Sequence, residues 1–221
     1  MRRALYFIGG LLCALYSLTA YAQEKLTALP EKYFKIRLYA DHVELYTQFK
    51  DALDKTRQEN LSNGFTTTIL VRAYLYDEAD PTTPIALTVR ETKVVYDLWE
   101  EVYTIQALEP GKTTSTTTSS KEAAIKQATT VEDLPLYFDT PLSSDTRYLI
   151  AVIVEVNPLS QELLAETKKW LSRTSGSSAK AGKSSGFFGS FVSIFVNVRQ
   201  GAAEYTSRFR SPIFSPPKKT Q

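Results

Sequence analysis

One stretch limits the fold of this chain more than any other: residues 65–78, with the sequence FTTTILVRAYLYDE. From Phe65 to Leu75 its inward-facing residues recur at every second position, which is the period of a β-strand. Threonine, tyrosine and β-branched residues also suit a pleated surface. We therefore expect a long strand here, with Phe65 and Leu75 on the same face.

Shorter runs with the same alternation predict that this strand belongs to an antiparallel sheet. Residues 34–40 and 43–49 both alternate, and only Asp41 and His42 separate them. A two-residue connection is typical of a tight β-hairpin. Short connections join consecutive strands into a meander. We expect further strands at residues 85–96, 101–107, 148–156 and 203–214.

The sequence therefore predicts a mainly β fold, an antiparallel sheet or sandwich of about seven strands with two or three packed helices. We expect one β-rich domain over residues 23–214. Flexible loops are expected at 110–120 and 173–186, because these segments are rich in serine, threonine, glycine and lysine and have little to bury. Residues 215–221 are predicted to form a disordered tail. The helices are expected at residues 50–64, 121–128 and 158–171.

Residues 1–22 have the pattern of a cleaved secretory signal peptide. Two arginines precede an apolar run, and Ala20 and Ala22 stand at the small positions that a signal peptidase requires. We therefore expect cleavage after Ala22 and a periplasmic or secreted mature chain. Two alternatives stay open: an uncleaved membrane anchor, and lipid attachment at Cys13, although the bulky Leu12 precedes it.

Removal of this signal peptide changes the charge and the cysteine content. The full chain has 26 Lys plus Arg and 24 Asp plus Glu, and the signal peptide holds two arginines and no acidic residue, so 24 of each remain. A chain without net charge or a dense basic run has no electrostatic footprint for nucleic acid, so we expect no nucleic-acid partner. Because Cys13 also leaves, the mature chain has no disulfide and no thiol nucleophile.

Two short motifs resemble known signatures but have the wrong spacing or context. Residues 176–184, GSSAKAGKS, place five residues between the first glycine and the Gly-Lys pair, whereas a phosphate-binding loop needs four. Ser177 and Lys180 have S-x-x-K spacing, yet such a serine must begin a buried helix and its surroundings here are linker-like. We expect a protein that is not an enzyme and has no cofactor.

The other titratable candidates are also expected to be structural. His42 is the only histidine, and neighbours in a hairpin point to opposite faces, so Asp41 is not expected to orient it as a general base. With one histidine and no cysteine, a zinc site is not expected. Glu100 and Glu101 follow Trp99, which we place at the corner of a turn. Adjacent carboxylates there favour a solvated turn over a cation site or an acid–base pair.

The segment GFFGSFVSIFVN, residues 186–197, is the strongest candidate for a partner contact. Its twelve residues would span about 18 Å as a helix, too short for a hydrocarbon core of about 30 Å, so no transmembrane span is expected in the mature chain. The spacing fits a helical stripe and a strand face, and both stay open. So do a place in the core and peripheral contact with a membrane. The candidate contact residues are Phe187, Phe188, Phe191, Ile194 and Phe195.

Three stretches together resemble a known family. LSNGFTTTILVRAYLY, VVYDLWEEVYTI and VIVEVNPLSQELLAETKKWL are similar to segments of exported proteobacterial proteins catalogued as a domain of unknown function. The similarity covers residues 34–171, and residues 187–197 and the last strand depart from it. The resemblance implies an envelope location and an antiparallel β architecture. The family has no established catalytic residues that could be carried over.

The function expected from these observations is binding or assembly in the cell envelope, with another envelope protein as the partner. The alternative is a carrier of a small apolar ligand or lipid that uses residues 187–198 as a lid or pocket wall. An enzyme would need a carboxylate pair held across neighbouring strands, which sequence alone does not reveal.

Overall fold

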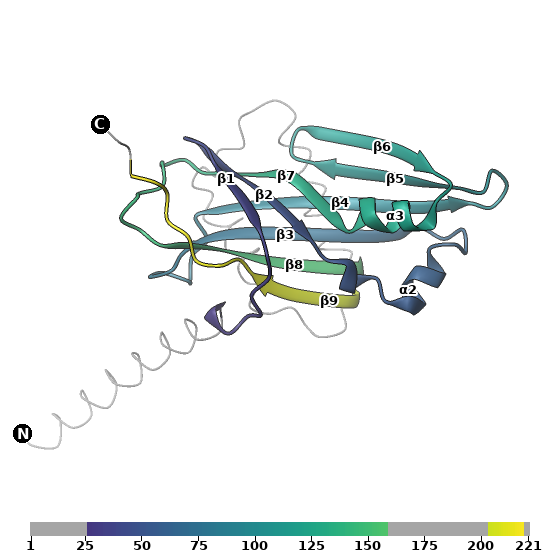
Figure 1. Cartoon of the computed structure of the whole chain (residues 1–221), viewed down its shortest axis with the longest axis horizontal. Coiled ribbons are helices and arrows are strands. Elements are labelled where there is room, and N and C mark those ends of the chain that lie inside the picture. Colours follow the sequence, from purple (N-terminus) through teal and green to yellow (C-terminus); the bar gives the residue numbers. More distant parts are fainter. Residues whose placement is uncertain (1–25, 159–202, 219–221) are drawn as a thin grey trace, which may run out of the picture.

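The structure is a computed structural model that describes residues 26–158 and 203–218, and within them the chain forms two antiparallel sheets (Figure 1). This confirms the predicted mainly β architecture. The larger sheet consists, in spatial order, of β6 (Lys112–Thr118), β5 (Val102–Glu109), β4 (Ala86–Asp97), β3 (Thr67–Asp77), β8 (Tyr148–Pro158) and β9 (Ala203–Arg210). The smaller sheet consists of β1 (Lys35–Leu38), β2 (His42–Gln48) and β7 (Thr130–Tyr137).

The described helices are short, and helices α2 and α3 begin at capping side chains. The predicted helix at 50–64 is split into the 3-10 helix η1 (Lys50–Ala52) and α2 (Lys55–Asn60). The split occurs because the carboxylate of Asp54 accepts from the backbone N–H of Arg57 and starts a new helix there. Helix α3 (Lys121–Ala128) lies where it was predicted, with Ser120 as its N-cap. No helix in the described part of the chain is both long and apolar enough to cross a membrane.

The two sheets pack face to face and enclose the main core, as in a β-sandwich. Figure 1 shows the smaller sheet lying across one face of the larger sheet. Val43 from β2 and Leu134 from β7 share one buried cluster with Val71 from β3 and Val154 from β8. The alternation seen in the sequence is therefore the alternation between this core and the opposite face of each strand.

The central strands β3 and β8 are buried on both faces. Ile69 and Val71 face the main core, whereas Leu70 and Tyr74 belong to a second buried cluster on the other face of the six-stranded sheet. Strand β8 is buried at every position from Tyr148 to Val156. Its nearly continuous apolar sequence is typical of a strand that is covered on both faces.

Most of the loop expected at 110–120 is instead strand β6, so that expectation is wrong. Pro110 and Gly111 make a two-residue turn, and β6 returns along β5 with an unbroken register. Gly111 has φ 71°, a conformation that glycine adopts without strain. The segment lacks apolar residues because it is an edge strand whose side chains face solvent, while threonine still favours extended backbone.

Three other local predictions need correction. Strand β7 was not predicted, because Pro135 and two acidic residues interrupt its alternation. Phe65 was expected inside but is 76% exposed, since β3 begins two residues later. Part of the expected disordered tail is ordered, and Pro216 and Pro217 line a hollow together with Leu38 at the end of β1.

Candidate functional site

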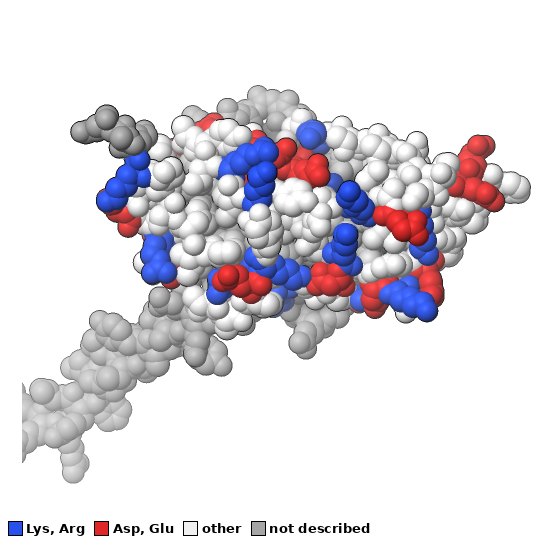
Figure 2. Space-filling model, viewed as in Figure 1, with Lys and Arg blue, Asp and Glu red and all other residues white. Residues whose placement is uncertain are grey.

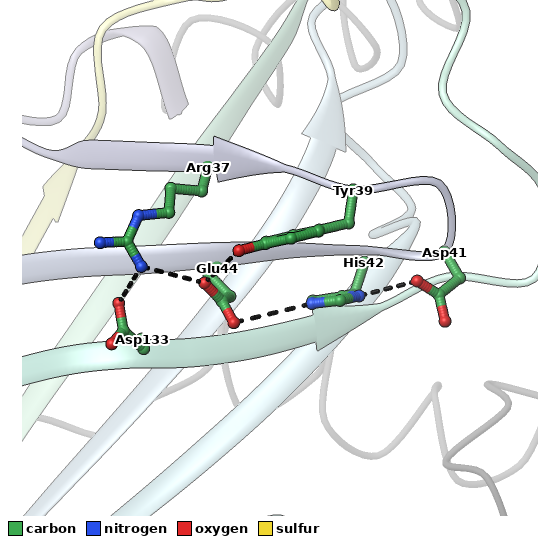
Figure 3. Close-up of polar contacts among 6 residues, drawn as sticks. All are labelled: Arg37, Tyr39, Asp41, His42, Glu44 and Asp133. Atoms are coloured by element: carbon green, nitrogen blue, oxygen red, sulfur yellow. Dashed lines mark hydrogen bonds and ion pairs between the residues drawn. The ribbon is translucent and has the colours of Figure 1, made fainter.

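One candidate site is a polar network on the outer side of the three-stranded sheet (Figure 3). The guanidinium of Arg37 on β1 places Nη1 2.9 Å from Asp133 Oδ1 on β7 and 3.5 Å from Glu44 Oε2 on β2. The hydroxyl of Tyr39 donates to the same oxygen of Glu44 at 3.0 Å. Glu44 therefore lies at the centre, with an arginine and a tyrosine on one oxygen.

His42 extends this network at the hairpin. Its Nδ1 lies 2.7 Å from Asp41 Oδ1, its Nε2 lies 3.8 Å from Glu44 Oε1, and its ring stacks on Tyr39 with centroids 4.3 Å apart. The expectation that Asp41 points away from His42 is wrong. Asp41 sits in the turn, where the alternation of strand side chains does not apply. The hydrogen bond with His42 lowers the pKa of Asp41.

This network links the three strands of the smaller sheet to one another. The side chains of Arg37 and Asp133 are 49% and 56% exposed, so solvent screens their attraction. The nearby Asp133 carboxylate raises the pKa of Arg37, which keeps the guanidinium charged. The pair joins β1 to β7 across β2, at a bulge where Asp133 has φ 52°. We therefore assign the network to holding this bulged sheet in register.

A second candidate is a groove of about 460 Å³ between α3 and strands β5 and β6. At its base Arg90 Nη1 lies 3.0 Å from Glu109 Oε1, and both side chains are largely buried. Burial lowers the pKa of Arg90 and raises the pKa of Glu109. The opposite charges of Arg90 and Glu109 neutralise each other in the wall of the groove. Its lining residues are Arg90, Ile105, Ala107, Glu109, Lys112, Thr114, Thr116, Ala123, Lys126, Gln127, Thr130 and Glu132.

A third candidate is the tip of the β4–β5 hairpin, where large apolar side chains face solvent. Trp99 is 94% exposed and Leu98 is 61% exposed. The turn itself is fixed: Asp97 Oδ1 accepts hydrogen bonds from the backbone N–H groups of Trp99 at 2.8 Å and of Glu100 at 3.0 Å. The structure confirms that Trp99 stands at a turn corner, with Glu100 and Glu101 exposed beside it.

The connection between α2 and β3 packs against this turn. A Cβ atom added to Gly64 would lie 3.1 Å from Leu98 Cδ1, so the side chain of Leu98 lies close to the backbone at Gly64. Phe65 follows Gly64 and is therefore at the same end of the sheet as Trp99. We call Phe65, Leu98 and Trp99 the apolar tip.

Acidic side chains surround the apolar tip. Asp97, Glu100 and Glu101 all belong to the turn or its flanks. In Figure 2 red side chains gather at the right-hand end, where Figure 1 places this turn. Among the residues that the structure describes, no three His, Cys, Asp or Glu side chains are arranged to hold a metal ion. The tip is thus an apolar surface with a negative rim.

Comparison with known families gives one match. Residues 31–170 match the family described as a domain of unknown function, DUF4390. The chain belongs to this family. The matched range contains the polar network, the groove and the apolar tip, whereas β9 follows it in the sequence. The predicted resemblance to a domain of unknown function over residues 34–171 is confirmed.

Other comparisons found no relative of this DUF4390 member. No curated protein matches the chain. No solved structure matches it either.

The residues first proposed as the contact lie outside the described part of the chain. This holds for Phe187, Phe188, Phe191, Ile194 and Phe195, and also for the expected signal peptide, most of the expected helix at 158–171 and the loop at 173–186. Their roles stay predictions. The sequence placed Trp99 at a corner but did not single it out as a contact. The sequence did contain a signal for such a contact, because a tryptophan between a leucine and two glutamates in a turn has no core to enter.

Proposed function

We propose that this protein is an exported, non-enzymatic binding module of the cell envelope that docks onto another envelope protein through its apolar tip. The observation that carries the proposal is the 94% exposure of Trp99 on a turn fixed by hydrogen bonds. Tryptophan is enriched among the residues that dominate binding energy at protein interfaces. An indole on a fixed turn also loses little conformational freedom when it is bound.

The charge around the tip favours a protein partner over a lipid surface. The carboxylates of Asp97, Glu100 and Glu101 lie beside Trp99, and anionic lipid headgroups would repel them. A protein with an apolar pocket and a basic rim would bury the indole and pair with these carboxylates. We therefore expect the partner to present such a pocket.

The envelope location and the lack of catalysis rest on separate observations. The pattern of residues 1–22 supports export. The only described histidine, His42, takes part in a network that links the three strands of the smaller sheet. Arg90 and Glu109 pair with each other in the wall of the groove. These contacts are those of structural groups, which supports a binding role.

The proposal is tested by placing a photoreactive benzoyl-phenylalanine at position 99 of the full chain in the cells that produce it. Position 33 is the matched control, because Tyr33 is also an exposed aromatic residue, at 77%. We expect a discrete protein adduct from position 99 that is absent from position 33 and lost when Leu98 is changed to Asp. Adducts with lipid alone, or equal adducts from both positions, would contradict the proposal.

A variant with Trp99→Ala separates binding from folding. Because the side chain is almost fully exposed, we expect the free energy of unfolding to change by less than about 0.5 kcal/mol. The same substitution is expected to weaken partner binding by at least about 2 kcal/mol, or roughly 30-fold. A loss of binding that accompanies a loss of stability would assign Trp99 to the fold instead.

A further inference from the structure

Strand β6 forms one edge of the six-stranded sheet and pairs only with β5 among the described strands. Its sequence, KTTSTTT, contains neither proline nor glycine, and its pairing with β5 runs without a register shift. Lys112 to Thr117 are exposed. The edge is therefore continuous, extended and accessible.

The hairpin geometry shows which backbone groups of β6 point away from the sheet. The two-residue turn closes at the pair Glu109 and Lys112, and such a closing pair exchanges both of its hydrogen bonds. Pairs then alternate along the strands, so the N–H and C=O groups of Thr113, Ser115 and Thr117 point outward. Within the described residues these groups have no hydrogen-bond partner at that edge.

The other described sheet edges carry features that discourage strand pairing, and β6 does not. Strand β1 is only four residues long and includes two basic residues. Strand β7 contains Pro135 and the bulge at Asp133. Residues 30–32 cover part of β9 through backbone hydrogen bonds to Arg210. Short, charged, bulged or covered edges are the usual protection against unwanted pairing.

We propose that β6 pairs antiparallel with β6 of a second copy of this chain, around a two-fold axis at Ser115. This register places Ser115 opposite Ser115 of the other copy and Thr113 opposite Thr117 of the other copy. All outward backbone groups of the three residues are then satisfied, two hydrogen bonds for each pairing. The two six-stranded sheets become one continuous sheet, and the interface is isologous.

The composition of the edge favours a second copy over an unrelated strand. The two-fold register pairs hydroxyl side chains with hydroxyl side chains, and threonine pairs across strands are favourable. The strand's one charged residue, Lys112, lies opposite Thr118 of the other copy, so no like charges meet. A different partner would need charges for selection, and Thr113, Ser115 and Thr117, whose backbone groups point outward, carry none. One short strand pair buries little surface, so the dimer forms at high concentration and dissociates on dilution.

Disulfide trapping tests this register directly in the full chain, in a Cys13→Ser background. Two Cα atoms in a hydrogen-bonded antiparallel pair lie about 5.5 Å apart, within the range for a disulfide. We expect Ser115→Cys to give disulfide-linked dimers at least ten times faster than Thr113→Cys. In the proposed register, residue 113 of one copy lies about four positions along the strand, or roughly 13 Å, from residue 113 of the other copy. The double variant Thr113→Cys/Thr117→Cys is expected to crosslink as fast as Ser115→Cys.

A proline variant checks the same edge without a crosslink. Because the N–H of Ser115 points outward, Ser115→Pro removes a bond to the second copy and none to β5. We expect the wild-type mass by light scattering to rise toward a dimer with concentration. The variant should stay monomeric with its melting temperature within a few degrees of wild type. A wild-type chain that is monomeric throughout, or equal crosslinking at positions 113 and 115, would overturn the proposal.

Discussion

The guanidinium of Arg72 and the carboxylate of Glu155 form an ion pair inside the sheet, with Nη2 2.7 Å from Oε2. Their side chains are 0% and 1% exposed. Arg72 lies on β3 and Glu155 on β8. Glu155 pairs with Leu70, which is two residues from Arg72, so both side chains are on the face that also holds Tyr74. A charged pair therefore crosses the two most buried strands in the described part of the chain.

This pair predicts an asymmetric response to mutation. Glu155→Gln leaves the Arg72 charge buried without its counter-ion, so we expect the free energy of unfolding to fall by about 3–5 kcal/mol. The double variant Arg72→Met/Glu155→Leu removes both charges and is expected to lie within about 2 kcal/mol of wild type. Urea unfolding of the three proteins measures both differences. Equal destabilisation by the single and double variants would show that the charges themselves do not set the stability.

Two glycines with similar backbone conformation provide a matched pair. Gly64 has φ 81° and Gly111 has φ 71°, so alanine is strained at both positions by about 1 kcal/mol. A Cβ at Gly64 also meets Leu98 at 3.1 Å, whereas nothing lies within 4 Å of one at Gly111. We expect Gly64→Ala to lose more stability than Gly111→Ala, by about 1 kcal/mol. Thermal unfolding of both variants measures the difference, and equal losses would exclude the contact with Leu98 as its cause.

The ion pair in the groove predicts how stability changes with pH. Burial raises the pKa of Glu109 above its ordinary 4.5, and the nearby Arg90 opposes this only in part. The folded state therefore binds this proton more tightly than the unfolded state. The contribution of Glu109 to stability is full below pH 4.5 and is lost as the pH rises through the folded pKa.

The variant Glu109→Gln removes this titration. Relative to wild type, we expect its free energy of unfolding to increase as the pH is raised from 4 toward 7. Urea unfolding at a series of pH values measures the difference between the two proteins. Should the variant instead lose stability relative to wild type over this range, attraction to Arg90 would outweigh burial. Glu132→Gln is the control, because Glu132 also lines the groove but is exposed.

Strand alternation predicted most strands of the larger sheet, because most of them bury at least one apolar face. The long strand β3 and the buried strand β8 follow directly from their sequences. Strands β6 and β7 were missed for opposite reasons. Strand β6 has no apolar face to detect, and β7 hides its buried Leu134 and Leu136 between acidic residues and a proline. Both segments are strands because they pair with a neighbouring strand, and the periodicity of a sequence does not reveal such pairing.

A residue of a candidate site could be predicted only where its local sequence determines its position in the fold. Trp99 could be put at a corner because the chain reverses there. The contact between His42 and Asp41 was not foreseen, since it depends on a turn that departs from strand geometry. The approach of Arg37 to Asp133 joins residues far apart in the chain, and the positive φ of Asp133 that makes it fit has no sequence signature.

The fixed geometry of the apolar tip predicts a dependence on acid. The backbone amides of Glu100 and Trp99 donate to the carboxylate of Asp97 and lower its pKa below the ordinary 3.8. The stabilisation from this carboxylate is therefore present above pH 3.8 and is lost as the pH falls through the lower folded pKa. Carbon-detected NMR titration of the Asp97 carboxyl group measures the pKa directly.

A substitution at Asp97 tests whether the titrating carboxylate keeps the apolar tip ordered. Asp97→Ala removes the acceptor, so at neutral pH we expect faster hydrogen exchange at the amides of Trp99 and Glu100. As the pH falls through the folded pKa, the wild-type turn should approach the variant, because a protonated carboxyl is a weaker acceptor. Asp97→Asn keeps an oxygen at this position without the charge and is expected to lie between them. If exchange at Trp99 is the same in all three proteins, the carboxylate does not hold the turn.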